Sequence, residues 1–284
     1  AARVLPMKTL DAKVVVITGA GSGIGRALAL ESAGRGALLA ISDIDEAGLA
    51  ETARLASDAG AGAVHTARLD VSDADAMTAY AAQVAEHFGR VNVIVNNAGV
   101  ALSGDFLDLE RPDMEWIIGI NFWGVVNGTK AFLPHLIASG DGHVVNLSSL
   151  FGLVSMPGQS MYNASKFAVR GMSEALRQEL LIAGHPVGVT VVHPGGIKTA
   201  IARNARVAPG EDQAATAELF DTKLARMAPE RAAEIIVKGM LAGKARVLVG
   251  IDAHALHHFA KLTGSRYQDL VARGSKRVLP AKLV

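Results

Sequence analysis

Short apolar segments alternate with helical patterns along most of this chain of 284 residues. Parallel strands need long crossover connections, so regular alternation of this kind is typical of a parallel sheet with helices on both faces. The pattern therefore predicts an α/β fold with about seven strands. The expected strands are 13–18, 37–42, 63–69, 91–95, 142–148, 187–193 and 246–249, and the expected helices are 23–34, 46–59, 73–88, 112–138 and 160–183.

The first strand runs directly into a glycine-rich turn and then into a helix. The turn has the spacing Gly19-x-x-x-Gly23-x-Gly25, which differs from the common dinucleotide fingerprint G-x-G-x-x-G. Glycines let a backbone turn sharply and approach a pyrophosphate, whose charge is favoured at the N-terminus of the next helix. We therefore expect a phosphate-binding turn that also includes Ser22 and Ile24, although a plain tight loop is the alternative.

The second strand ends at Asp43, eighteen residues beyond Gly25. A carboxylate in this position is expected to bind the ribose hydroxyls of an adenine nucleotide and to repel a 2′-phosphate. Arginine and lysine are absent from the turn and from the residues directly after Asp43, so the sequence favours NAD over NADP. The alternative is that Asp43 only caps a helix that starts near Asp45.

Tyr162 and Lys166 stand four residues apart, and Ser149 lies thirteen residues before the tyrosine. Positions i and i+4 share one face of a helix, so the ammonium of Lys166 is expected beside the phenol and is predicted to lower the pKa of Tyr162. Ser149 follows an apolar strand and is expected to project from its carboxyl end. Together these residues indicate proton transfer to or from an alcohol or carbonyl. The alternative is an ordinary amphipathic surface helix.

These motifs, taken together and in order, resemble the short-chain dehydrogenase/reductase family, in its branch of short single-domain subunits. The resemblance covers about residues 10 to 200 and implies a Rossmann-type doubly wound sheet. It rests on Thr18-Gly-x-x-x-Gly23-x-Gly25, Asp70-Val71, Asn96-Asn97-Ala98-Gly99, Asn121, Ser149, Tyr162-x-x-x-Lys166, and Pro194-Gly195 followed by Thr199.

The resemblance also implies roles for individual residues. It implies a catalytic tetrad of Asn121, Ser149, Tyr162 and Lys166, in which Asn121 anchors a water that links Lys166 to solvent. The alternative for Asn121 is a helix residue that bonds to backbone. The family further implies these cofactor-binding residues: Asp70 and Val71 beside the adenine, Asn97 and Gly99 along the cofactor, Tyr162 and Lys166, and the segment Pro194, Gly195, Ile197 and Thr199 around the nicotinamide.

Composition narrows the class of protein. Half of the residues are hydrophobic, so one chain of this length buries a sizeable core and is expected to form a single domain, 1–284. The net charge of +1 argues against a nucleic-acid groove. The chain has no cysteine, no apolar run of about twenty residues and no signal-peptide pattern, so we expect a cytoplasmic protein. The histidines at 254, 257 and 258 lack acidic neighbours that would favour metal, and no metal site is expected.

Two segments depart from the regular alternation. Residues 200–228 are polar and alanine-rich, and we expect a lid over the substrate, with a plain surface excursion as the alternative. Residues 252–284 form a longer C-terminal extension than the family usually has, with apolar residues near helical spacing and basic residues after them. Subunit contact is the first interpretation, a packed helix the second and contact with an anionic membrane the third. A homodimer or homotetramer is expected.

The residues around the expected site are mainly apolar, which favours a hydrophobic secondary alcohol or its ketone as substrate. They are Leu150, Phe151, Val154, Met156, Pro157, Met161 and Ile201. The sequence thus predicts an NAD-dependent oxidoreductase with Tyr162 as general acid/base, working in the oxidative direction. Two alternatives stay open. One is an NADP-dependent reductase of carbonyl or acyl-carrier substrates, and the other is a non-catalytic regulator that senses NAD.

Overall fold

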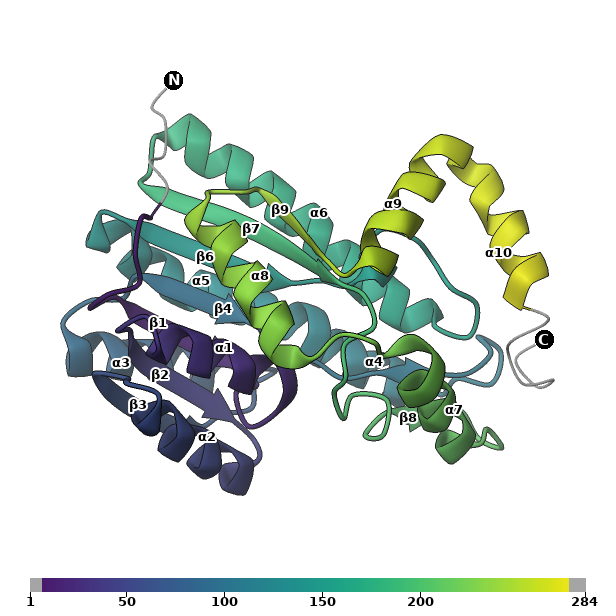
Figure 1. The fold of residues 1–284 in the computed structure, drawn as a ribbon, viewed down its shortest axis with the longest axis horizontal. Helices are drawn as coiled ribbons and strands as arrows, with labels where there is room; N and C mark the ends of the chain where they lie inside the picture. The colour runs from purple at the N-terminus through teal and green to yellow at the C-terminus, as the bar shows by residue number, and fades with distance from the viewer. Residues whose placement is uncertain (1–6, 276–284) are drawn as a thin grey trace.

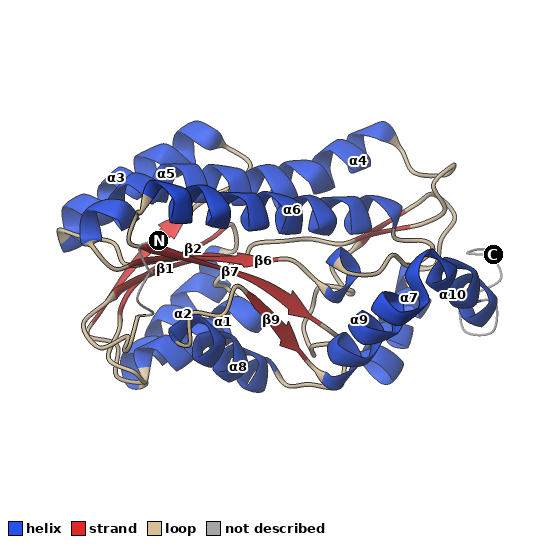
Figure 2. Ribbon diagram, turned by 90° about the horizontal axis from the view of Figure 1, so that it is seen from above, coloured by secondary structure: helices blue, strands red, loops and turns tan. Residues whose placement is uncertain are grey.

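The computed structural model describes residues 7–275, which form a twisted seven-stranded sheet between two layers of helices (Figures 1 and 2). All neighbouring strands of this sheet pair in parallel, in the order β3-β2-β1-β4-β6-β7-β9. The order reverses between β1 and β4, which confirms the predicted doubly wound, Rossmann-type sheet. The strands are β1 (Val14–Thr18), β2 (Leu38–Asp43), β3 (Ala63–Arg68), β4 (Val93–Asn96), β6 (Gly142–Leu147), β7 (Val187–Pro194) and β9 (Arg246–Val249).

Two helical layers bury the two faces of the sheet (Figure 2). One layer contains α1 (Gly23–Ala33), α2 (Glu46–Asp58) and α8 (Pro229–Leu241), and the other contains α3 (Ala74–Phe88), α5 (Gly124–Ser139) and α6 (Ser160–Ala183). The central strands are buried on both faces, as continuous apolar runs such as Val14–Thr18 predict. A separate apolar cluster lies beneath each layer, so the sheet divides the core in two.

The helices begin and end where local chemistry favours it. Asp45 and Asp73 cap α2 and α3 through side-chain oxygens that accept a backbone N–H. Gly89, Gly140 and Gly184 close α3, α5 and α6 in the left-handed conformation that glycine adopts at low cost. These signals explain why the expected elements agree with the observed ones to within two residues at most ends.

The predicted single helix over 112–138 is wrong in detail. The segment contains α4 (Arg111–Ile118), one π-turn, η1 (Gly119–Trp123), and then α5. Apolar periodicity does not register one extra residue in a turn, because the side chains on both sides still face the same core. The π-turn contains Asn121, which the sequence singled out for other reasons.

Several elements escaped the sequence pattern. A small parallel pair, β5 (Leu102–Ser103) with β8 (Arg206–Val207), joins segments about one hundred residues apart. Residues 200–228 also contain the short helix α7 (Gln213–Leu219) and a π-turn, η3 (Phe220–Leu224). The helix α8 was likewise not expected. The two-residue strands and the seven-residue α7 carry too little periodic signal to be seen without their tertiary partners. This reason does not apply to α8 (Pro229–Leu241), whose thirteen residues include one buried face.

The C-terminal extension folds into α9 (Ile251–Thr263), a 3-10 turn η4 (Gly264–Arg266) and α10 (Tyr267–Ser275), and its last residues, 276–284, lie outside the described chain. Ala253 and His257 are buried, and α9 contributes Leu256 and Ala260 to an apolar cluster with Leu150 and Val154. Helix α9 therefore packs against the rest of the fold, as the second interpretation of the extension predicts. The subunit-contact and membrane interpretations stay predictions.

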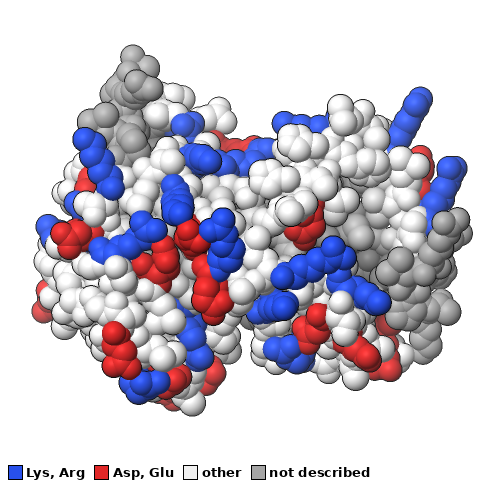
Figure 3. All heavy atoms as spheres, viewed as in Figure 1, with Lys and Arg blue, Asp and Glu red and all other residues white. Residues whose placement is uncertain are grey.

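On the face seen in Figure 3, lysines and arginines are intermingled with aspartates and glutamates. None of the helices in residues 7–275 combines the length and the hydropathy that crossing a bilayer requires.

Candidate active site

The glycine-rich turn joins β1 to α1 at the carboxyl edge of the sheet. Gly19 and Gly23 have φ of +66° and +54°, in the left-handed region that favours glycine. A Cβ on Gly25 would lie 2.1 Å from the carbonyl oxygen of Gly19, so this position also excludes a side chain. In contrast to α2 and α3, which aspartates cap, α1 starts at Ser22 without a side-chain cap bond. The turn thus presents a helix N-terminus suited to an anionic pyrophosphate.

Thr18 and Asn97 hold this turn against the end of β4. The Asn97 amide donates to the carbonyl oxygens of Thr18 and Gly19, at 2.9 and 3.0 Å. The Thr18 hydroxyl in turn accepts from the backbone N–H of Asn97 and Ala98, at 3.1 and 3.2 Å. Asn97 therefore lies at the end of β4 and positions the turn, while its expected contact with the cofactor stays a prediction.

Asp43 also contacts the turn. Its carboxylate accepts from the backbone N–H of Gly21 at 2.7 Å and from that of Asp45 at 3.0 Å. The N-cap of α2 is Asp45 itself, whose side chain accepts from Gly48. The alternative in which Asp43 caps that helix is therefore wrong.

Sequence reasoning missed Arg26, which lies one residue beyond Gly25. Its guanidinium donates to the carbonyl oxygens of Gly21 and Gly48 and to the hydroxyl of Thr52. These bonds brace the back of the turn against α2. The sequence shows a basic residue immediately after the last glycine of the turn. Only the tertiary contacts of Arg26 with α2 show that it braces the turn.

The loop after β3 contains Asp70 and Val71. One oxygen of Asp70 accepts from both the backbone N–H and the hydroxyl of Ser72, at 2.9 and 2.7 Å. The Val71 carbonyl accepts from Asn127 of α5 at 3.0 Å, which ties the loop to the neighbouring layer. Both residues thus lie at the same sheet edge as the glycine turn.

Asn121 is fully buried in the π-turn between α4 and α5. Its amide accepts from the Val100 N–H at 2.8 Å and donates to the Val100 carbonyl at 2.9 Å. It also donates to the Ser165 hydroxyl at 3.2 Å. The interpretation in which Asn121 bonds to backbone therefore describes this side chain, and the expected water link to Lys166 stays a prediction.

Ser149, Tyr162 and Lys166 come together at the ends of β6 and α6. The Ser149 oxygen accepts from the N–H of Phe151 at 3.1 Å, which fixes the start of the following turn. Lys166 is buried, donates to the Leu147 carbonyl at 3.1 Å and lies 5.7 Å from the centre of the Tyr162 ring. A Cβ on Gly99 would lie 3.4 Å from the Lys166 ammonium, so the loop after β4 closes the site on that side.

The ionisation of this group differs from the prediction. Burial raises the pKa of the Tyr162 phenol, and a hydrogen bond with Ser149 opposes the shift. Burial also lowers the pKa of Lys166 to about 8. The expected lowering of the Tyr162 pKa is therefore wrong in direction, because burial is the largest influence on this phenol and disfavours its charged form.

The segment after β7 returns to the glycine turn. Ile197 is buried and forms a bridge with Met227, while the side chain of Thr199 would lie 3.1 Å from a Cβ on Gly23. The segment therefore lies beside the glycine turn, and its expected contact with the nicotinamide stays a prediction.

Two further residues shape that segment. Asp252 accepts from the Gly196 N–H at 2.7 Å and fills the space above Gly195, where a Cβ would lie 2.2 Å from its carboxylate. His193, just before Pro194, bonds through Nδ1 to the Ser149 carbonyl at 2.8 Å. Asp252 was missed because it lies in the C-terminal extension, more than fifty residues away in sequence.

Two histidines of α9 lie side by side. His257 and His258 contact each other with ring centres 5.4 Å apart. Within residues 7–275, no three histidine, cysteine or acidic side chains are arranged to hold a metal ion.

Residues 200–228 lie over the carboxyl edge of the sheet and are attached at two points. β8 pairs with β5, and Arg206 forms an ion pair with Asp113 at 2.7 Å and stacks over Trp116 with 3.9 Å between the guanidinium carbon and the ring centre. At the other end, Ile197 bridges Met227. The segment is therefore held against α4, beside the cluster that contains Met161 and Tyr162.

Comparison with known proteins agrees with this geometry. The family model of short chain dehydrogenases matches residues 13–209. The "Putative oxidoreductase SadH" of Mycobacterium tuberculosis is 59% identical over 274 residues, 96% of this chain and 99% of that protein. The epidermal retinol dehydrogenase 2 of Mus musculus is 40% identical over 195 residues, 68% of this chain and 63% of that protein.

Solved structures show the same fold. A short chain dehydrogenase/reductase from Burkholderia phymatum, crystallised in complex with NAD, superposes with a TM-score of 0.83 at 32% identity, covering 90% of this chain and 95% of that one. Fold, site geometry and sequence similarity agree, and this chain is an oxidoreductase of the short-chain dehydrogenase/reductase family.

Proposed function

We propose that this protein interconverts a hydrophobic secondary alcohol and its ketone with NAD as cofactor, and that Tyr162 is the general acid/base. The observation that carries the proposal is the meeting of Ser149, Tyr162 and Lys166 beside a glycine turn that Asp43 contacts directly. Asn121 completes the proposed tetrad by holding the loop after β4, through Val100.

The residues at the sheet edge fit a dinucleotide. The uncapped start of α1 and the side-chain-free glycines suit a pyrophosphate, and Asp43 lies at the end of β2, where ribose hydroxyls are bound in doubly wound sheets. Bound NAD would accept the hydride from the carbinol carbon. The proposed contacts of the chain are those of the glycine turn with the pyrophosphate, of Asp70 and Val71 with the adenine, and of Gly99 and the segment Pro194 to Thr199 with the nicotinamide half.

The protein residues would handle the proton. The Ser149 hydroxyl holds the substrate oxygen, and Tyr162 takes the hydroxyl proton in oxidation or returns it to the ketone oxygen in reduction. Because burial raises the pKa of Tyr162, the neutral phenol dominates at neutral pH, which suits donation to a ketone. Lys166 keeps its place through the Leu147 carbonyl and directs its remaining donors towards the cofactor ribose.

The surroundings support an apolar substrate. Phe151 contacts the Tyr162 ring edge-on with 6.1 Å between ring centres, and Val100, Met161 and Trp116 belong to the apolar cluster around the tyrosine. A relative, epidermal retinol dehydrogenase 2, has a name that indicates an apolar alcohol. We propose residues 200–228 as the segment that covers this substrate.

Preference for NAD rests on Asp43, and its replacement tests the proposal. We expect wild-type protein to bind NADH more tightly than NADPH in fluorescence titrations and to reduce NAD with some member of a panel of hydrophobic secondary alcohols. Asp43→Ala should weaken the binding of NADH and strengthen the binding of NADPH, because the charge that repels a 2′-phosphate is lost. We expect the ratio of the two affinities to change by about tenfold or more.

Asp45→Ala is the matched control, since it also removes one carboxylate, but one that accepts from the Gly48 N–H and caps α2. Tighter NADPH than NADH binding by the unmodified protein would contradict the NAD assignment. NADH binding without turnover across the whole panel would favour a non-catalytic sensor over the enzyme.

A further inference from the structure

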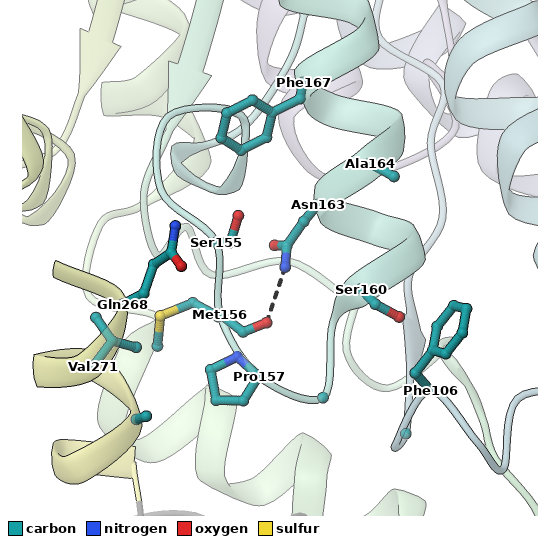
Figure 4. Close-up of a pocket in the computed structure, with 13 residues that line it drawn as sticks. Phe106, Ser155, Met156, Pro157, Ser160, Asn163, Ala164, Phe167, Gln268 and Val271 are labelled. Atoms are coloured by element: carbon teal, nitrogen blue, oxygen red, sulfur yellow. Dashed lines mark hydrogen bonds between the residues drawn. The ribbon is translucent and has the colours of Figure 1, made fainter. Parts of the chain in front are cut away.

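The two helices of the C-terminal extension contact different parts of the fold. α10 lines a hollow with the first turns of α6 and the loop before it, where Gln268 and Val271 lie near Met156 (Figure 4). α9 starts directly after β9, at the edge of the sheet that carries the segment Pro194 to Thr199 (Figure 1). Because that segment is the proposed nicotinamide site, the contacts of α9 bear on the cofactor.

The backbone pairing of β7 with β9 stops within this segment. Gly195 donates its N–H to the Val249 carbonyl at 2.8 Å, and the chain then leaves the sheet at Gly250, whose φ is +108°. β9 therefore offers no further carbonyl to the N–H of Gly196. The Asp252 carboxylate takes the place of that carbonyl and accepts this N–H at 2.7 Å. A hydrogen bond to a charged oxygen is stronger than one to a neutral carbonyl.

The Asp252 carboxylate has little freedom to move. A Cβ on Gly195 would overlap both carboxylate oxygens, and a Cβ on Gly250 would overlap Oδ1. Backbone thus packs directly against the carboxylate from the end of β7 and from the start of α9. An acceptor displaced by one methylene group would push on this backbone or lose its bond to Gly196.

Gly196 is held on its other side by the end of residues 200–228. Its carbonyl accepts from the N–H of Arg226 and from that of Met227, at 3.0 and 3.2 Å. A Cβ on Gly196 would overlap the Leu224 carbonyl oxygen, so this contact also requires a glycine. The C-terminal extension therefore fixes the N–H of Gly196, and the proposed substrate cover fixes its carbonyl.

We propose that Asp252 is a positioning residue for the nicotinamide half of the cofactor. Its carboxylate sets the position of the Gly196 peptide and thereby the shape of the segment Pro194 to Thr199. The inference rests on the proposed function, because it takes that segment as the nicotinamide site. The adenine half should not depend on Asp252, since Asp43 lies at the end of β2 and three strands separate β2 from β7.

The test compares the binding of NADH with that of ADP-ribose, which lacks the nicotinamide ring. NADH is titrated by its fluorescence, and ADP-ribose by competition with NADH. Asp252→Ala should weaken the binding of NADH by about tenfold and that of ADP-ribose by less than about twofold. Asp269→Ala is the matched control, because it removes an exposed carboxylate from the first turn of α10, and it should change neither affinity.

Two conservative variants separate the position of the acceptor from its charge. Asp252→Asn keeps an oxygen in the same place and should retain the affinity for NADH to within about threefold. Asp252→Glu keeps the negative charge in the first turn of α9 but moves the oxygens by one methylene group, so it should weaken NADH as much as Asp252→Ala does. A carboxylate that only stabilises the start of α9 through the helix dipole predicts the reverse order.

That reverse order would overturn the proposal, and so would equal losses of NADH and ADP-ribose binding in Asp252→Ala. Hydrogen exchange of the free protein tests the contact without any cofactor. Peptides that cover residues 194–199 should exchange faster in Asp252→Ala than in wild-type protein or Asp269→Ala, and unchanged exchange would also overturn the proposal. Absence of turnover in a protein that shows these differences would contradict the proposed catalysis alone.

Discussion

Replacing Tyr162 by Phe removes one oxygen and keeps the ring that Phe151 contacts edge-on. We expect Tyr162→Phe to lower kcat for alcohol oxidation by about 10²- to 10⁴-fold, the usual contribution of a general acid/base. NADH affinity should change little, because Lys166 is held separately through the Leu147 carbonyl. Steady-state kinetics and NADH titration measure the two effects. Equal losses of NADH binding and turnover would contradict a role in proton transfer.

The pH dependence of the reaction follows from the same residue. Because burial raises the pKa of Tyr162, the form that accepts a proton is scarce at neutral pH. Oxidation should therefore accelerate as pH rises above 7, by about tenfold per pH unit at most, while reduction should not. A pH profile of kcat/KM in both directions tests this expectation. A flat oxidative profile between pH 6 and 9 would contradict it.

At the scale of elements, the segment 200–228 is attached to the rest of the fold through β8. Arg206→Ala would remove both the ion pair with Asp113 and the stacking over Trp116. We expect KM for the alcohol to rise about three- to tenfold with unchanged NADH affinity, because a loosened segment covers the substrate less often. Arg203→Ala is the control, since Arg203 pairs with Asp221 inside the segment. An equal rise in KM for the alcohol in both variants would contradict a specific role of Arg206 in attaching the segment.

At the scale of the whole molecule, two buried histidines make stability depend on pH. Burial lowers the pKa of His143 and of His193 to about 4 in each case. Between pH 6.5 and 4 the unfolded chain binds these protons and the folded protein does not, so stability falls as pH falls, by about 1.4 kcal/mol per pH unit for each histidine.

The melting temperature should therefore decrease steadily from pH 7 to pH 5. His143→Gln should make that decrease smaller, even if it lowers stability at pH 7 by disturbing the bond to Thr190. The exposed His254→Gln is the matched control on α9. An unchanged slope in His143→Gln would show that other groups govern acid sensitivity.

The sequence by itself determined the parallel sheet, most of its strands and the positions of the glycine turn, Ser149, Tyr162 and Lys166. These features depend on local signals, namely apolar periodicity, glycine spacing and the i, i+4 geometry of a helix. Asp43 and Asn97 were also placed at the correct sheet edge, because the carboxyl ends of parallel strands meet there.

Only the tertiary structure decided what depends on contacts between distant segments. Burial shifts the Tyr162 pKa in the direction opposite to the expected one. The side-chain amide of Asn121 forms hydrogen bonds with the backbone of Val100. Asp252 reaches Gly196 from the C-terminal extension, and α10 lines a hollow beside the first turns of α6. Desolvation and long-range packing depend on which segments meet in space, and no local pattern in the sequence carries that information.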